Sequence, residues 1–193
     1  MKAERTNANK VRITKAFVDR WSARYDEDYL HSEYHPVEQS LKTWLAEQRG
    51  QKFLDKGRFL KLAAWKSPRA KRHHERNDSD FVREVTELAF QQDDERLSLH
   101  ILMALDGVGM PVASALLHFA FPDRYPILDF HVVQALTEVG LWQRAKAPDF
   151  TLAEWLKFTQ LMRERAGRLG VPMRDLDKAL WAFDKFGPKP EGG

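Results

Sequence analysis

The sequence of 193 residues contains no cysteine. Without thiolates it can form no disulfide framework, zinc–thiolate site or iron–sulfur cluster, and nothing in it requires an oxidising compartment. It also lacks a long hydrophobic run, because the longest, Val112–Phe121, is far too short to span a bilayer. The first ten residues are polar and lack the apolar core of a secretory signal. We therefore expect a cytoplasmic protein with no part in a membrane.

The residues that are present are typical of a globular domain. Hydrophobic residues make up 43% of the chain and charged residues 31%, so a core can form without cross-links. The net charge is only +3, but basic residues gather in the segments Met1–Arg24 and Trp65–Arg76, whereas acidic residues gather in Glu84–Glu95. Such asymmetry fits a surface that binds a polyanion, although solvated charge is also what helix exteriors ordinarily carry.

Apolar residues recur at helical spacing along the chain, and strand alternation never persists. Thr151 and Glu154 have the spacing of a capping box at a helix start. The sequence predicts a single all-α unit over residues 1–187, followed by a disordered tail over residues 188–193. One predicted helix has its N-cap at Ser79 and buries a face made of Phe81, Val85 and Leu88. The next predicted helix buries a face made of Leu97, Ile101, Ala104 and Leu105.

One segment is more specific. An apolar helix ends at Asp106-Gly-Val-Gly109, and a second helix begins at position 110 or 111. The two glycines permit a tight turn, and Pro111 suits the first turn of a helix because its missing N–H would have no partner there. The N–H groups of Val108, Gly109 and the second helix would form an anion site, helped by the helix dipole. Residues 94–121 are therefore predicted to form a helical hairpin whose turn can bind a phosphate.

This hairpin resembles the helix-hairpin-helix motif, and the residues beyond it extend the match. Tyr125-Pro-Ile-Leu-Asp129 follows, with Asp129 standing 20 residues after Gly109. The helix-hairpin-helix base-excision DNA glycosylase superfamily has an Asp at a helix start at a similar distance, and its adenine-glycosylase branch has a very similar Pro-Ile-Leu-Asp pattern. The resemblance covers residues 97–136 and is compatible with residues 151–186. Over residues 1–90 it rests only on helical character.

The resemblance implies an all-α fold with a cleft between two helical lobes. It makes Asp129 the catalytic carboxylate, and Gly107, Val108 and Gly109 the turn that grips a DNA phosphate. Carbonyls of such a turn can also hold a monovalent cation, and no other cofactor or metal is expected. The position that carries Lys in strand-cutting members of the superfamily is Pro111 here. Without that amine no Schiff base forms at this position, so the resemblance implies hydrolysis of an N-glycosidic bond without lyase activity.

The basic segment Trp65–Arg76 supplies further candidates. Lys66, Arg69 and Lys71 are the predicted contacts to phosphates of double-stranded DNA outside the hairpin. The alternative is an ordinary solvated face or loop, because runs of charge are common on protein surfaces. Replacing the three residues would weaken binding to every DNA sequence alike if the prediction holds.

Three other features have an ordinary and a functional interpretation. Trp65 stands at a helix end beside basic residues, where it could stack on a base, although core packing is the common role of tryptophan. His73 and His74 lie in the basic segment and are expected to be exposed rather than catalytic. His31 and His35 are four residues apart, but a proline follows at once and no third ligand is in register, so no metal site is predicted.

The functional prediction has two rivals. Asp is among the best N-cap residues, so Asp129 could serve only to begin a helix. The main prediction is a monofunctional DNA glycosylase that removes a damaged or mismatched base. The first rival is a non-catalytic helix-hairpin-helix module that binds DNA or another partner on the same fold, since fold does not fix function. The second is an interaction protein unrelated to nucleic acid, which the absence of basic residues around the hairpin would favour.

Overall fold

The computed structural model describes residues 11–30, 32, 35–48, 50–143 and 150–188. Within these residues the chain forms ten α-helices, one 3₁₀-helix and no β-strand, which confirms the predicted all-α class. His31 and residues 189–193 of the predicted tail lie outside the described residues. The elements are α1 (Lys15–Tyr29), α2 (His35–Glu47), α3 (Lys56–Lys66), η1 (Pro68–Ala70), α4 (Lys71–His74), α5 (Ser79–Phe90), α6 (Glu95–Leu102), α7 (Met110–Ala120), α8 (Phe130–Glu138), α9 (Leu152–Leu169) and α10 (Met173–Phe186).

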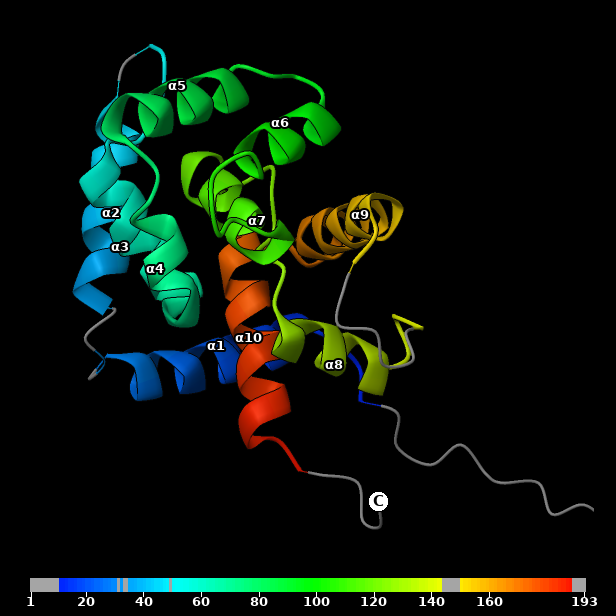
Figure 1. Ribbon diagram of the computed structural model, residues 1–193. Coiled ribbons are helices and arrows are strands. Elements are labelled where there is room, and N and C mark those ends of the chain that lie inside the picture. The colour runs from blue at the N-terminus through cyan, green and yellow to red at the C-terminus, as the bar shows by residue number, and fades with distance from the viewer. Residues whose placement is uncertain (1–10, 31, 33–34, 49, 144–149, 189–193) are drawn as a thin grey trace, which may run out of the picture.

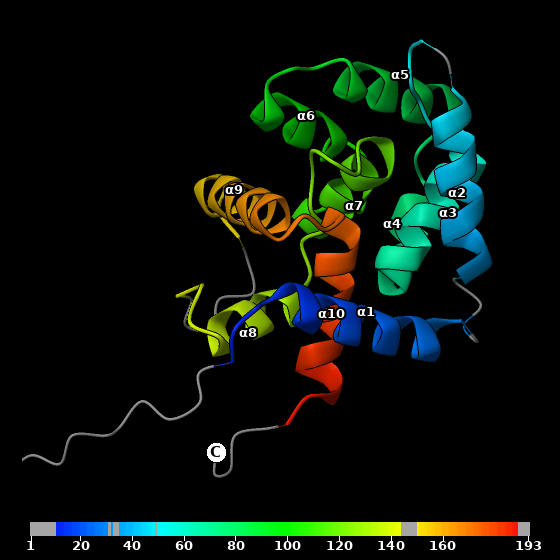
Figure 2. The ribbon, with the colours of Figure 1, turned by 180° about the vertical axis from the view of Figure 1, so that it is seen from behind.

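The helices form two groups, which Figures 1 and 2 show from opposite sides. Helices α2–α7 pack on one another and are called the hairpin lobe here. Helices α1, α8 and α9 all pack against α10, and these four helices are called the terminal lobe. The first described helix thus lies beside the last described one, so both belong to one lobe. This long-range pairing of α1 with α10 builds one side of the cleft described below.

The two buried faces predicted for α5 and α6 are correct only in part. Val85 and Leu105 are buried, and Ile101 packs partly buried against the core. The N-cap of α5 is Asp78, whose side chain accepts from the Phe81 N–H, and Ser79 is already helical. Phe81, Leu88 and Leu97 are exposed. The residues that these two helices bury are Val82, Val85, Thr86, Ala89, Phe90, Ser98, Leu99 and Leu102. For the three exposed residues the prediction was wrong, because apolar residues stand on both adjoining faces of each helix and spacing alone cannot tell which face the lobe covers.

Helix α9 begins as its sequence predicts. The Thr151 hydroxyl accepts from the Glu154 N–H at 3.3 Å, and the Glu154 carboxylate accepts from the Thr151 N–H at 2.7 Å. Both bonds of the capping box are therefore present. The predicted box is confirmed because its two partners lie within one helical turn, where no other part of the fold has to be known.

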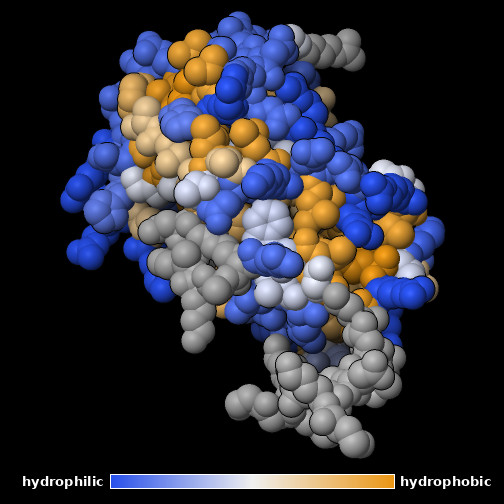
Figure 3. Space-filling view, turned by 90° about the vertical axis from the view of Figure 1, so that its right-hand side faces the viewer, coloured by the Kyte–Doolittle hydropathy of each residue, from blue (hydrophilic) through white to orange (hydrophobic). Residues whose placement is uncertain are grey.

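The surface carries mixed residue types. On the face shown in Figure 3, hydrophobic residues lie in separate areas between hydrophilic ones. The most exposed large hydrophobic side chain of the described residues is Phe130, which directly follows Asp129. None of the described helices combines the length and the apolar character needed to cross a membrane.

Candidate functional site

Helices α6 and α7 form the predicted hairpin, and its turn depends on Gly107. This residue has a φ of +79°, in the left-handed region that favours glycine. A Cβ atom placed on Gly107 would lie 2.7 Å from Cδ2 of His74 and 2.8 Å from Cβ of His73. Position 107 therefore requires glycine for two reasons: its backbone conformation disfavours other residues, and helix α4 leaves no space for a Cβ atom.

Two buried side chains hold this turn from behind. The His74 Nε2 lies 3.0 Å from the Gly107 carbonyl oxygen. The Asn77 amide accepts from the Asp106 N–H at 2.8 Å and donates to the Asp106 carbonyl at 3.1 Å. Burial lowers the pKa of His74, which favours a neutral ring that donates its Nε2–H to the carbonyl. The prediction that His74 is exposed was wrong, because its neighbour in space stands 33 residues away in sequence.

The turn offers fewer free N–H groups than predicted. The Val108 N–H donates to the Leu105 carbonyl at 3.0 Å, and Val108 is buried. The N–H groups of Gly109 and Met110, at the N-terminus of α7, remain able to bind an anion. Two of the turn's carbonyls already accept hydrogen bonds from the side chains behind it. The monovalent cation at this turn stays a prediction.

Helix α7 also fixes the segment that leads to Asp129. The Ser114 hydroxyl accepts from the Leu128 N–H at 2.9 Å, and the His118 Nδ1 lies 2.7 Å from the Tyr125 carbonyl oxygen. Ser114 and His118 are four residues apart, so one face of the helix holds both ends of the segment. Burial lowers the pKa of His118 to about 3, so its ring is neutral and donates Nδ1–H to that carbonyl. The hairpin therefore places the carboxylate that follows it.

Asp129 both begins a helix and faces an open space. Its Oδ1 accepts from the His131 N–H at 2.9 Å, which confirms that it is the N-cap of α8. Its Oδ2 lies 2.5 Å from the Nζ of Lys66, and the side chain stays 25% exposed. Burial favours the neutral acid, but the charge of Lys66 and the hydrogen bonds outweigh burial and lower the pKa of Asp129. The N-cap role and a role in a site are thus compatible.

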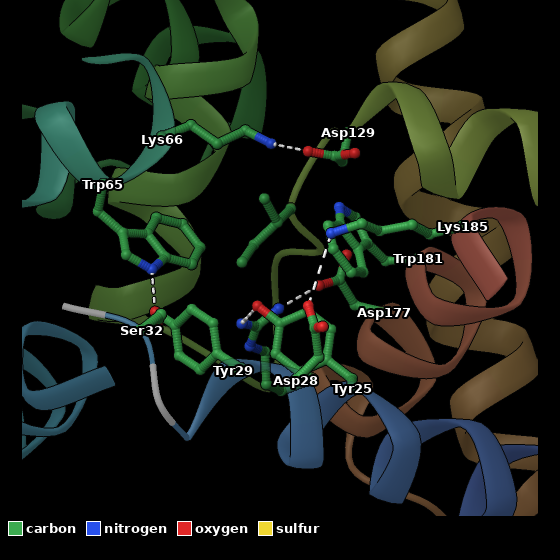
Figure 4. Close-up of a pocket in the computed structure, with 12 residues that line it drawn as sticks. Tyr25, Asp28, Tyr29, Ser32, Trp65, Lys66, Asp129, Asp177, Trp181 and Lys185 are labelled. Carbon is green, nitrogen blue, oxygen red and sulfur yellow. Dashed lines mark hydrogen bonds and ion pairs between the residues drawn. The ribbon is translucent and has the colours of Figure 1, made fainter. Parts of the chain in front are cut away.

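The open space is a cavity of about 360 Å³ between the two lobes. Its wall comes from α1, the end of α3, the segment before α8, and α10. Figure 4 shows Lys66 and Asp129 together on one side and the tyrosines of α1 on the opposite side. Four aromatic side chains line the cavity, Tyr25, Tyr29, Trp65 and Trp181. The predicted cleft between two helical lobes corresponds to this cavity.

Lys66 does not lie where the sequence predicts. It is the last residue of α3, its side chain is only 8% exposed, and its amine lies beside Asp129 at the start of α8. Arg69 and Lys71 follow the bend at Ser67-Pro68 and are exposed. They belong to η1 and α4, beside the hairpin turn. A phosphate contact therefore stays a prediction for Arg69 and Lys71, whereas the burial of Lys66 does not suit that role.

Arg174 ties three helices together behind the cavity. Its Nε and Nη2 donate to the Glu38 carboxylate of α2 at 3.1 and 3.0 Å, and its Nη2 lies 3.1 Å from the Tyr25 hydroxyl of α1. Its Nη1 donates to Asp177, one turn further along α10. Burial would raise the pKa of Glu38, but Arg174 and Lys42 hold it well below its ordinary range. The wall of the cavity is thus built on buried, paired charges.

Asp177 is a second carboxyl group in the cavity wall. One oxygen accepts from Arg174, and the other, Oδ1, is buried with no hydrogen-bond partner among the described residues. Burial raises the pKa of Asp177 to about 6. The charge of Arg174 lowers this pKa, and the charge of Asp129 raises it further. One cavity therefore holds two carboxyl groups whose pKa values are shifted in opposite directions. Such a pair is typical of a site that needs one ionised and one protonated carboxyl group.

Sequence analysis missed the wall that α10 supplies, although a signal is present. Arg174, Asp177, Trp181 and Lys185 follow one another at spacings of three, four and four residues, which places them on one face of a helix. A face rich in charge is ordinarily turned to solvent. Only the packing of α1 against α10 shows that this face is turned inward.

No family model and no curated protein matches this chain. It is similar to the crystal structure of Methanocaldococcus jannaschii 8-oxoguanine glycosylase/lyase in complex with 15mer DNA containing 8-oxoguanine. The identity is 16%, the TM-score is 0.48, and the match covers 90% of this chain and 91% of that chain.

Proposed function

We propose that this protein is a DNA glycosylase that hydrolyses the bond between a damaged or mismatched base and its deoxyribose. The observation that carries the proposal is the placement of Asp129. Its carboxylate is fixed as an N-cap, its pKa is lowered, and it faces an aromatic-walled cavity beside a hairpin of the phosphate-binding type. The proposed site thus combines a reactive carboxylate, a cavity large enough for a base and a hairpin that can bind a DNA phosphate.

The cavity suits a base turned out of the double helix. Enzymes that act on a base must first extrude it into a pocket, where it stacks on aromatic side chains. The cavity volume of about 360 Å³ lies within the range of roughly 300–1,000 Å³ found for ligand pockets. Tyr25 and Tyr29 form one wall, with ring centroids 5.1 Å apart, and Trp65 and Trp181 form two others.

The two carboxyl groups have separate tasks in the proposed reaction. As the C1′–N bond breaks, positive charge develops on the sugar and the bonding electrons move to the base. The ionised Asp129 stabilises this charge and accepts a proton from the water that adds to C1′. Asp177, whose pKa is raised to about 6, donates a proton to the departing base. The products are a free base and an abasic sugar.

The hairpin and the helix behind it provide the proposed DNA-binding surface. The N–H groups of Gly109 and Met110 receive one phosphate at the start of α7. Arg69 and Lys71 stand exposed beside the turn and bind further phosphates of double-stranded DNA. Such contacts hold any DNA sequence, so recognition of the target base belongs to the cavity.

The test needs no knowledge of the target base. A duplex with a cationic pyrrolidine in place of one sugar mimics the charged transition state, which enzymes bind at least about a hundredfold more tightly than the ground state. We expect the protein to prefer this duplex over an undamaged one by about that factor at fixed salt. Asp129→Asn should lose the preference and keep the affinity for undamaged DNA. Asp28→Asn, a carboxylate of the same cavity, is the matched control and should keep both.

The other outcomes of this measurement decide between the rivals. Equal affinity of the unchanged protein for both duplexes would contradict the glycosylase proposal and favour a non-catalytic DNA-binding module. A lack of binding to either duplex would favour an interaction protein unrelated to nucleic acid.

A further inference from the structure

A primary amine lies inside the proposed active site. The Nζ of Lys66 is 2.5 Å from Oδ2 of Asp129, and its side chain is 8% exposed. The two residues come from different lobes and lie side by side on one side of the cavity, as Figure 4 shows. The end of α3 that carries this amine is anchored by the preceding residue, because the Trp65 Nε1–H donates to the Tyr29 hydroxyl of α1. These contacts hold the amine of Lys66 at one position in the cavity.

We propose that Lys66 is the nucleophile of a strand-cutting lyase activity, which acts on the abasic sugar left after base removal. The inference rests on the proposed function in that the substrate is an abasic site in DNA. It replaces the expectation, drawn from Pro111, that the chain lacks an amine for this reaction. That expectation was based on the hairpin alone, whereas in the structure Lys66, at the end of α3, places an amine in the cavity.

The position of Asp129 determines what Lys66 can reach. A carboxylate that stabilises charge at C1′ must lie next to C1′, and an amine 2.5 Å from the same carboxylate is then within reach of that carbon. The cavity also limits the water that competes for the sugar, because both side chains are largely withdrawn from solvent. Geometry therefore favours attack by Lys66 once the base has left.

The reaction balances without an added oxidant or reductant. A proton of Lys66 passes to Asp129, and Nζ adds to the aldehyde carbon C1′ of the ring-opened sugar. Asp129 returns this proton to the carbinolamine hydroxyl, which leaves as water as the C1′=N bond forms. A carboxylate of the cavity then removes a C2′ proton, and the C3′–O bond breaks with its electrons going to the phosphate. Water finally hydrolyses the C=N bond, which frees Lys66 and leaves an unsaturated aldehyde on one strand end and a phosphate on the other.

A second lysine of the same cavity provides the control. Lys185 of α10 lines the cavity, but its side chain is 43% exposed and lies 3.5 Å from Asp28 rather than from Asp129. If any amine near an abasic site reacted, Lys185 would react as well as Lys66. The two lysines therefore separate a positioned nucleophile from chance contact.

The experiment uses a duplex with a preformed abasic site, so it does not depend on base removal. In the presence of borohydride, which reduces the C=N bond, we expect a covalent complex whose cross-linked peptide contains Lys66. Lys66→Arg keeps a positive charge beside Asp129 but should lose both the cross-link and strand cleavage. It should still bind the pyrrolidine duplex, which shows that the variant is folded. Lys185→Arg should form the cross-link as the unchanged protein does.

Three results would overturn the proposal. They are a cross-link at Lys185, an undiminished cross-link in Lys66→Arg, and no cross-link in a protein that prefers the pyrrolidine duplex. In the last case the glycosylase proposal would stand without the lyase. Failure of the glycosylase proposal itself would appear separately, as equal affinity for the pyrrolidine and undamaged duplexes.

Discussion

The residues that form the hairpin are close together in sequence, whereas those that line the cavity come from distant segments. The hairpin with its two helices spans residues 95–120, and the cavity collects side chains from Tyr25 to Lys185. The hairpin is also held mainly by neutral hydrogen bonds to backbone groups, whereas the wall of the cavity rests on buried ion pairs around Arg174. The course of the hairpin follows from its local sequence, and His74 and Asn77 of the same lobe hold its turn, whereas the cavity exists only after the two lobes have packed together.

The largest effect should come from breaking the ion pairs of the cavity wall. Arg174→Met leaves the buried Glu38 with Lys42 alone and Asp177 without its partner. Uncompensated buried charge of this kind costs about 3–5 kcal/mol. Denaturant unfolding should show this loss. The control is Arg168→Met, which removes an exposed ion pair with Glu164 on α9 and should change the free energy of unfolding by less than about 1 kcal/mol. A loss below that limit for Arg174→Met would show that the wall does not depend on these charges.

A smaller loss of stability is expected from the hairpin. Gly107→Ala meets both an unfavourable φ and the side chains of His73 and His74, for a cost of about 1–3 kcal/mol. Gly170→Ala is the matched control, because its φ is +63° and nothing lies within 4 Å of the added Cβ. Urea unfolding of both variants isolates the contact with α4. Equal losses would mean that α4 yields to the new methyl group.

The two carboxyl groups of the cavity predict a dependence of base release on pH. Protonated Asp177 is the active form, so the single-turnover rate should fall as pH rises through about 6, by about tenfold for each further pH unit. Asp129 does not cause this fall, because its lowered pKa keeps it ionised throughout that range. Asp177→Asn should be slow and should show no such fall. A rate that is constant from pH 5 to 8 in the unchanged protein would exclude Asp177 as the proton donor.

The smallest effect concerns the exposed basic residues beside the hairpin. Replacing Arg69 and Lys71 together with Ala should weaken binding to undamaged and pyrrolidine duplexes equally. The plot of log affinity against log salt concentration should become shallower by about two, since each lost phosphate contact removes about 0.9 from the slope. Lys15→Ala, an exposed basic residue of α1 that is paired with Asp19, should change neither quantity. A change in the preference between the duplexes would place Arg69 or Lys71 in the cavity chemistry instead.

The accuracy of the sequence predictions follows the distance over which each interaction acts. The hairpin, the N-cap at Asp129 and the capping box at Thr151 were predicted because each depends on residues within a turn or two. The burial of Phe81 and Leu88 on α5 and the exposure of His74 were predicted wrongly, because each depends on which distant segment covers the residue. Lys66 was assigned to the surface from the charges around it, whereas its side chain lies beside Asp129, a residue 63 positions further along the chain.

The sequence by itself determined that the chain is helical, where the hairpin turns and which aspartate begins the helix after it. Those features depend on backbone conformation and on contacts within one helical turn, which residue types and spacing specify. Only the tertiary structure decided that Asp129 faces Lys66, that Asp177 loses contact with water, and that α1 and α10 close the cavity. These depend on burial and on charges brought together from distant segments, and both arise only when the two lobes pack against each other.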